Sequence, residues 1–280
     1  MSYEAQTLFY QAAYEGCVAA AANLKAANID SADAQTRASL LYAARAHLAL
    51  DNPAAALALL PEDAQRKDVI AVRTLAAFLQ DGDIEALNTL SELVEEVADA
   101  GQADGNDEDG DALHTIRICA ATAAFKDDDA LGALETLTAA HQQIECTALA
   151  VHILLSIHRP DLAQRQYEAA RAWADDSLLI QLIEAWLGLG TGGRAAQQAY
   201  YVYDELAQSS SLANSKSLVP VLVGKAAALA VQAKYAEADK VLADAAQLDP
   251  RHPQVLANRA ALAGHLSAAR TDDAAQEYIE

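Results

Sequence analysis

Cysteine, proline and phenylalanine are scarce in this chain of 280 residues, which contains three cysteines, six prolines and three phenylalanines. Three cysteines are too few for a disulfide scaffold, so the sequence predicts a cytosolic protein. No run of about 18 or more apolar residues occurs, which argues against a membrane-spanning helix. The opening residues, MSYEAQTLFYQAAYEG, lack a basic start followed by an apolar run, and we therefore expect no signal peptide.

Basic side chains are also few. The 19 lysines and arginines face 40 acidic residues, and the formal net charge is −21. This charge disfavours binding to a nucleic-acid backbone and direct docking on an anionic membrane. The histidines and cysteines show none of the C-x-x-C, H-x-x-x-H or H-E-x-x-H spacings of metal sites, and no Gly-x-Ser-x-Gly elbow occurs. We expect no catalytic residues, no metal site and no cofactor.

Alanine and leucine are abundant, and they recur in helical patterns of about 12–16 residues separated by short polar turns. Alternating strand patterns between turn residues are absent. The sequence therefore predicts an all-α protein.

One stretch shows a repeat most clearly: AKYAEADKVLADAAQLDPRHP, residues 233–253. It places small residues at Ala238 and Ala245, an aliphatic residue at Leu242 and a closing Pro250, which is the pattern of a tetratricopeptide-type hairpin of about 34 residues. The same spacing puts a small residue in the second helix of each unit at Cys17, Ala56, Ala86, Ala133, Ala163, Ala199 and Ala238. The facing positions in the first helices are Ala5, Ala44, Thr74, Ala121, Val151, Ala185 and Ala226.

These spacings predict a right-handed, tetratricopeptide-like superhelical solenoid of about seven helical hairpins. We expect a single domain over residues 1–280. The longest interval between units contains the acidic stretch DAGQADGNDEDGDA at 99–112, which we interpret as a flexible insertion.

A glycine cluster at Gly188, Gly190, Gly192 and Gly193, followed by Arg194, has two possible meanings. A dinucleotide-binding loop needs G-x-G-x-x-G between a strand and a helix, and a P-loop needs Gly-Lys before Ser or Thr. Here the spacing is G-x-G-x-G-G after a helical pattern, with no such lysine. We predict a hinge in which Gly192 or Gly193 takes the left-handed conformation that ends a helix. An enzyme that uses the cluster to bind a nucleotide is the alternative.

The first helix of each hairpin lines the concave face of such a solenoid, and those positions are mostly apolar here. They predict a groove that encloses an apolar or extended segment of a partner, because a bare apolar groove would promote aggregation. The candidate groove residues are Leu41, Arg45, Leu48, Leu75, Phe78, Ile118, Phe125, His152, Leu155, Leu182, Trp186, Leu189 and Val223. A tight superhelix that closes on itself is the alternative. A clamp for acidic peptides is disfavoured, because only Arg45 is basic among these positions.

Two stretches make the chain resemble a known family: ECTALAVHILLSIHRPDLAQRQYEAA (145–170) and LIQLIEAWLGLGTGGRAAQQAYYVYDELA (179–207). They are similar to the epsilon subunits of coatomer, the coat of COPI vesicles. The stretch YAEADKVLADAAQLDPRHPQVLANRAAL (235–262) and the opening LFYQAAYEGCVAAAANL extend the likeness, whereas the acidic insertion departs from it.

The resemblance implies a tetratricopeptide-like structural subunit without enzymatic activity. It implies an obligate pairing with the C-terminal domain of the coatomer alpha subunit, binding to other coatomer subunits, and transport from the Golgi to the ER and within the Golgi. The protein would then be cytoplasmic and peripheral on Golgi membranes and COPI-coated vesicles, held there indirectly by the coat. A tetratricopeptide peptide-binding adaptor or co-chaperone of another complex is the alternative.

Overall fold

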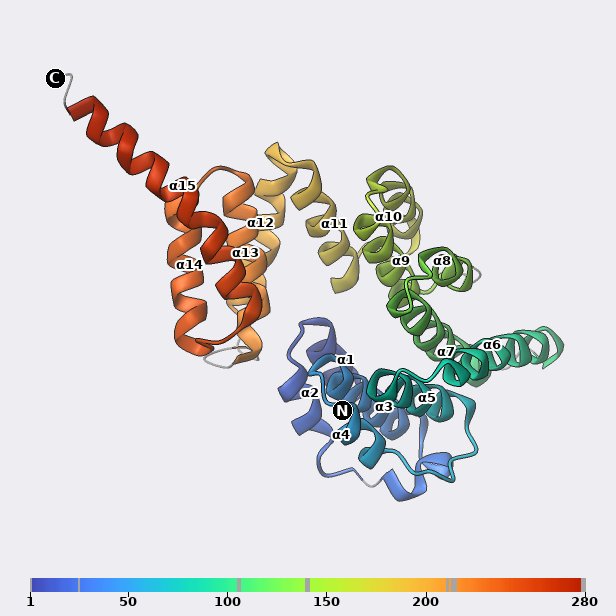
Figure 1. Ribbon diagram of the computed structural model, residues 1–280. Helices are drawn as coiled ribbons and strands as arrows, with labels where there is room; N and C mark the ends of the chain where they lie inside the picture. The colour runs from blue at the N-terminus through green and yellow to red at the C-terminus, as the bar shows by residue number, and fades with distance from the viewer. Residues whose placement is uncertain are drawn as a thin grey trace. The chain divides into compact units, whose positions relative to one another are not determined.

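In the computed structural model, every regular element in the described part of the chain is a helix (Figure 1). The structure describes residues 2–24, 26–104, 107–138, 142–209, 212 and 216–277, and side chains within 4–24, 29–97, 112–138, 142–209, 212 and 216–266. The chain divides into two compact units, Met1–Ile180 and Gln181–Glu280. The all-α prediction is confirmed, and the single domain over 1–280 stays a prediction.

Unit 1 consists of helices that follow one another in pairs. They are α1 (Ser2–Tyr10), α2 (Tyr14–Ala21), η1 (Ala26–Ser31), α3 (Ala34–Ala49), α4 (Pro53–Leu59), α5 (Lys67–Asp81), α6 (Ile84–Asp104), α7 (Asp107–Lys126), α8 (Ala130–Thr138), α9 (Ile144–Ser156) and α10 (Pro160–Ala174). Unit 2 contains most of α11 (Leu178–Thr191), then α12 (Gly193–Ala207), η2 (Lys216–Leu218), α13 (Val219–Val231), α14 (Tyr235–Leu248) and α15 (Pro253–Glu277).

The hairpin turns share a left-handed residue, which reverses the chain between the two helices. The residues with positive φ at these turns are Ala12, Asp51, Gly82, Asp128, His158, Gly192 and Ala233. Side-chain caps and prolines then start the second helices. Asn52 accepts a hydrogen bond from the Ala55 amide at 3.2 Å, and Pro53 and Pro160 occupy first-turn positions where no amide donor is needed.

The small residues that define the repeat are buried where the two helices of a hairpin approach each other. In the second helices, the exposed fraction is 0% at Cys17, Ala56, Ala133, Ala163 and Ala238, 2% at Ala199 and 7% at Ala86. Their partners in the first helices are buried too, apart from the partly buried Thr74. The predicted register is therefore confirmed along the chain.

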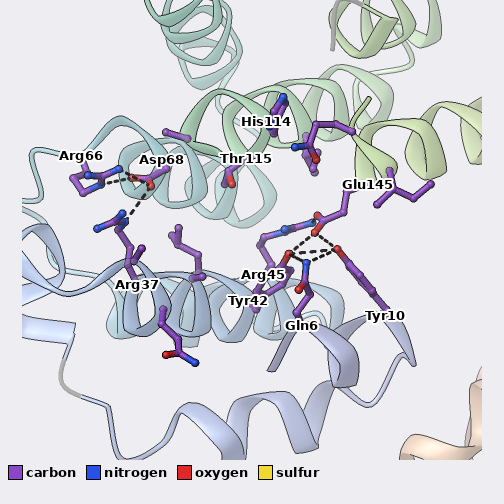
Figure 2. Close-up of a pocket in the computed structure, with 18 residues that line it drawn as sticks. Gln6, Tyr10, Arg37, Tyr42, Arg45, Arg66, Asp68, His114, Thr115 and Glu145 are labelled. Carbon is purple, nitrogen blue, oxygen red and sulfur yellow. Dashed lines mark hydrogen bonds and ion pairs between the residues drawn. The ribbon is translucent and has the colours of Figure 1, made fainter. Parts of the chain in front are cut away.

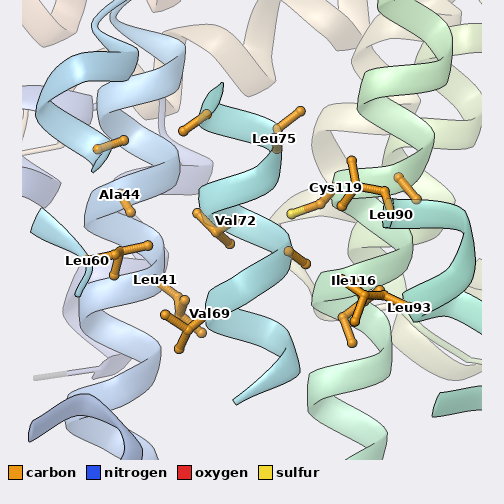
Figure 3. Close-up of a cluster of buried hydrophobic side chains, with 14 of the residues drawn as sticks. Leu41, Ala44, Leu60, Val69, Val72, Leu75, Leu90, Leu93, Ile116 and Cys119 are labelled. Atoms are coloured by element: carbon orange, nitrogen blue, oxygen red, sulfur yellow. The ribbon is translucent and has the colours of Figure 1, made fainter. Parts of the chain in front are cut away.

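Side chains from α3, α5, α6 and α7 form the main core of unit 1 (Figure 3). Leu41 and Ala44 face Val69 and Val72, and Leu90 and Ile116 extend the cluster on the other side of α5. Cys119 and Cys146 are each 1% exposed and belong to the core of unit 1. In unit 2, Leu242 packs with Ala226, Leu229, Ala238 and Leu262.

The glycine cluster forms the turn between α11 and α12, as the sequence predicts. Gly188 and Gly190 lie within α11, whereas Gly192 and Gly193 have φ values of +79° and +58°. The Gly192 amide donates to the Gly188 carbonyl at 2.9 Å and so caps the helix. A Cβ atom on Gly188 would lie 2.5 Å from the Ala195 carbonyl oxygen, so the crossing of the two helices requires glycine there.

The acidic insertion has helical backbone in its described residues. Its backbone is helical over 99–104, at the end of α6, and over 107–112, at the start of α7. A run of acidic residues such as DED at 107–109 favours the N-terminus of a helix because of the helix dipole. Residues 105–106 lie outside the described residues, and the flexibility of the insertion stays a prediction.

Candidate functional site

Most of the predicted groove residues are buried or partly buried by contacts within the chain itself. Leu41, Leu75, Phe78, Ile118 and Leu182 are buried, with exposed fractions of 4–8%. Arg45, Leu48, Phe125, Leu155, Trp186, Leu189 and Val223 are partly buried, and His152 is exposed at the edge of the Phe125 ring. A contact between these residues and a partner stays a prediction.

Three of the predicted residues, Leu41, Arg45 and Ile118, line a cavity of about 450 Å³ within unit 1 (Figure 2). The cavity is bordered by α1, α3, the start of α5, α7 and the start of α9. These are the first helices of successive hairpins, the ones expected to form the inner face. The cavity combines apolar residues such as Leu41 and Ile118 with polar and charged ones, among them the residues labelled in Figure 2.

Glu145, at the start of α9, is the centre of the larger polar cluster. Its Oε2 accepts a hydrogen bond from Arg45 Nη2 at 2.8 Å, and its Oε1 accepts from the hydroxyls of Tyr10, at 2.5 Å, and of Tyr42. The Gln6 amide donates to both tyrosine oxygens, at 2.8 and 2.9 Å. The cluster joins α9 to α1 and α3.

Burial and charge set the ionisation of this cluster. Burial alone raises the pKa of Glu145, but Arg45 and the hydrogen bonds from Tyr10 and Tyr42 outweigh it and leave the pKa below its ordinary value. Burial and the Glu145 charge raise the pKa of both tyrosines well above the ordinary range. At neutral pH Glu145 is therefore an anion, Arg45 a cation, and the tyrosines are neutral donors.

Arg45 is also held by aromatic rings. Its guanidinium carbon lies 4.8 Å from the Phe9 ring centre and 5.2 Å from that of Tyr42. Contacts of this kind stabilise a partly desolvated cation. The ion pair and the ring contacts together fix the position of Arg45, whose side chain is 13% exposed.

A second cluster lies where α3 meets the start of α5. The buried Asp68 accepts hydrogen bonds from Arg66 Nε at 3.2 Å and Arg66 Nη2 at 3.4 Å. Arg37 Nε lies 3.7 Å from Asp68 Oδ2, and Arg37 Nη1 donates to the Ala32 carbonyl at 3.1 Å. Two guanidinium groups thus share one carboxylate at the end of the cavity opposite Glu145 (Figure 2).

The three cysteine thiols are buried. Burial raises the pKa of Cys17 to about 11 and those of Cys119 and Cys146 to about 12, so these thiols stay protonated at neutral pH. The described side chains contain no group of three His, Cys, Asp or Glu residues placed to hold a metal ion. In the described part of the chain, no helix is both long and apolar enough to span a bilayer.

The sequence identified Arg45 but none of the groups that hold it. Glu145 is 100 positions from Arg45 and 135 from Tyr10, and no local spacing links them. Arg37, Arg66 and Asp68 were missed for a related reason, because they lie in the first turns of α3 and α5 and in the connection before α5 rather than at groove positions.

Known proteins resemble this chain in sequence. The family model described as coatomer epsilon subunit matches residues 2–280. The chain is 29% identical over 250 residues to coatomer subunit epsilon-1 of Arabidopsis thaliana, and the match covers 89% of this chain and 78% of that protein. It is 27% identical over 154 residues to the probable coatomer subunit epsilon of Schizosaccharomyces pombe, with 54% of this chain and 51% of that protein covered.

Among solved structures, the chain resembles one from the crystal structure of the APC/C hetero-tetramer Cut9-Hcn1. The TM-score is 0.56 at 15% identity, and the match covers 94% of this chain and 48% of that chain. This likeness concerns the fold alone. It supports a tetratricopeptide-like solenoid, as the sequence predicts.

Proposed function

Because this chain belongs to the coatomer epsilon subunit family, we propose that it works in the COPI coat by binding the C-terminal domain of the alpha subunit. In this proposal the pairing is obligate, and the protein supports vesicle transport from the Golgi to the ER and within the Golgi. It acts as a structural subunit without enzymatic activity or cofactor. It is cytoplasmic and peripheral on Golgi membranes and COPI-coated vesicles.

One observation supports the choice of surface. The first helices of consecutive hairpins, α1, α3, α5, α7 and α9, border a single cavity, and predicted groove residues line it. Repeat proteins bind extended partners along the surface that such helices form. The partner segment in this proposal lies along these helices and makes its polar contacts at the cavity.

The net charge of −21 supports an indirect association with membranes. A strongly acidic chain is repelled by anionic lipid headgroups, and membrane docking by charge needs clustered lysines and arginines. In this proposal a neighbouring protein of the coat binds the membrane and holds the acidic chain there, so that the chain itself does not contact anionic lipids.

Co-expression with a C-terminal fragment of the alpha subunit, followed by size-exclusion chromatography, tests the proposal. We expect the two chains to elute together. Leu155→Glu should abolish co-elution, because an unpaired charge buried in an interface costs several kcal/mol. Leu131→Glu is the matched control, since Leu131 is 71% exposed and lies at the start of α8.

The helical circular dichroism of each free variant shows whether it has folded. Failure of the unmodified chain to pair with the fragment would refute the proposed partner. Normal pairing by Leu155→Glu, Phe125→Glu and Trp186→Ala alike would instead refute the inner face as the binding surface.

A further inference from the structure

The cavity in unit 1 is locally cationic although the chain as a whole is acidic. Its charged lining residues are Arg37, Arg45, Arg66, Asp68 and Glu145, together with the titratable His114. Three arginines face two carboxylates there, whereas the whole chain has 19 basic and 40 acidic residues. Such a reversal of sign favours an anionic ligand at this place.

Both carboxylates in the cavity already bind donors of the protein itself. Glu145 accepts from two tyrosine hydroxyls and from Arg45. Asp68 accepts from the Val69 amide at 2.9 Å and from two nitrogens of Arg66, with Arg37 beside its second oxygen. Both anions are already neutralised by the protein's own cations.

The arginines, in contrast, keep unused donors. A guanidinium carries five N–H groups in a fixed plane. Arg66 uses Nε and Nη2 for Asp68, which leaves Nη1, and its side chain is 24% exposed. Arg37 uses Nη1 for the Ala32 carbonyl and points Nε at Asp68, which leaves Nη2 without a hydrogen-bond partner among the described residues.

We propose that Arg37 and Arg66 form a receptor for one carboxylate, an aspartate or glutamate side chain carried by the protein segment that binds the inner face. A single negative charge balances the single excess cation of the cavity, whereas a phosphate carries close to two. Carboxylates also suit the planar donors of arginine. Leu41, Ile118 and Ile144 supply apolar lining for the stem of the side chain.

The alpha subunit as owner of that carboxylate rests on the function proposed above, but the receptor itself is testable without it. The probe is N-acetylglutamate amide, added to the full chain while the arginine Nε–H signals are followed by NMR. Arg37→Gln and Arg66→Gln assign the two signals. We expect both to shift and saturate with this probe and to stay in place with N-acetylglutamine amide.

Two results of the titration would overturn the receptor. The first is an absence of shifts with the carboxylate probe. The second is a response to inorganic phosphate without one to the carboxylate, which would make the site a receptor for a free anion. Both results are independent of any partner.

The second arm measures affinity for the C-terminal fragment of the alpha subunit. Arg66→Gln should weaken it roughly tenfold or more, because a charge-assisted hydrogen bond is lost, and Arg66→Lys should restore part of it. Arg159→Gln is a close control. Arg159, like Arg66, directly precedes a helix, and it donates two hydrogen bonds, both at 2.9 Å, to the aspartate two positions later. Unlike Arg66 it lies outside the cavity, and its side chain is 50% exposed.

Equal affinities for Arg66→Gln and the unmodified chain would show that the bound segment does not supply the carboxylate. If the unmodified chain fails to bind the fragment while the arginine signals still respond to the probe, the proposed function fails and the receptor stands. The two proposals are therefore separated by their results.

Discussion

Glu145 is the single residue on which the polar cluster of unit 1 depends. Its carboxylate accepts every hydrogen bond that joins the start of α9 to Tyr10, Tyr42 and Arg45. A buried ion pair is weak evidence for net stability, since an apolar replacement of both partners is often neutral, but removal of one partner leaves the other charge buried alone. The cluster is therefore sensitive to the loss of one charge.

Glu145→Gln should lower the free energy of unfolding at pH 7 by about 3 kcal/mol, because Arg45 keeps its charge in a site that is no longer neutral. The loss should depend on pH. Since the folded-state pKa of Glu145 lies below its ordinary value of 4.5, the stability it contributes is fully present above about pH 4.5 and is lost as the pH falls through the folded-state pKa. Urea unfolding across this range measures the difference.

Glu96→Gln is the control, because Glu96 also pairs with a cation, Lys67 at 2.8 Å, but its side chain is 63% exposed. An exposed pair of this kind contributes about 1 kcal/mol or less. A gap between Glu145→Gln and the unmodified chain that stays constant from pH 7 to pH 3 would contradict an ionised Glu145 in the folded state.

At this scale the sequence predicted positions but not partners. It placed Arg45 on the inner face, since that depends on helical spacing alone. It could not pair Arg45 with Glu145, because the two residues lie 100 positions apart and meet only in the folded chain. It likewise placed Leu75 and Phe78 in a groove, but could not tell that α6 and α7 would leave them only 4% and 8% exposed.

Among the elements, the hairpins were the most predictable feature. Two helices that cross closely need a small residue at the contact, and such residues recur in the sequence at a nearly fixed spacing. The acidic insertion shows the opposite case. Its composition suggests a loop, yet the backbone continues α6 to Asp104 and begins α7 at Asp107, because flanking helical segments can extend through such residues.

Ala163→Leu tests the crossing of α9 and α10. Ala163 is fully buried, so the larger side chain should overpack the hairpin and cost about 1–3 kcal/mol in thermal or urea unfolding. Ala169→Leu, at an exposed position of the same helix, is the control and should change stability little. Ala238→Leu in α14 should repeat the loss, and unchanged stability in both buried variants would contradict close helix crossings at these two residues.

The two glycines within α11 provide a matched pair. Gly188→Ala places a Cβ atom against the Ala195 carbonyl and should cost about 1–3 kcal/mol, because a backbone atom cannot move aside cheaply. Gly190 has open space around its Cα, so Gly190→Ala should stabilise by about 0.5–1 kcal/mol through the lower entropy of the unfolded chain. Chemical unfolding of both variants gives the comparison, and similar effects would contradict the close crossing at Gly188.

For the whole molecule, the fold class was predictable because the same pattern of small residues at hairpin crossings recurs along the chain. Each repeat of the pattern supports the assignment of the next hairpin. The division near residue 180 was not predictable for the same reason. The repeat spacing runs on from Val151 through Ala163 to Ala185 and Ala199, whereas the structure divides after Ile180. The repeat pattern is the same on both sides of residue 180, so it does not mark such a division.

The division makes a prediction about cooperativity. Leu242 is fully buried in unit 2 among Ala226, Leu229 and Leu262, and Ile116 is fully buried in the core of unit 1. Truncation of either to alanine should lower the free energy of unfolding by about 2–5 kcal/mol.

In a repeat protein that loss of stability falls on the unit that contains the truncated side chain, because each hairpin contacts mainly its neighbours. Leu242→Ala should therefore speed amide hydrogen exchange in α13 and α14 and leave α3, α5 and α7 protected, and Ile116→Ala should do the reverse. Mass-spectrometric exchange on the full chain measures both. Equal acceleration throughout the chain in both variants would mean that the two units unfold as one.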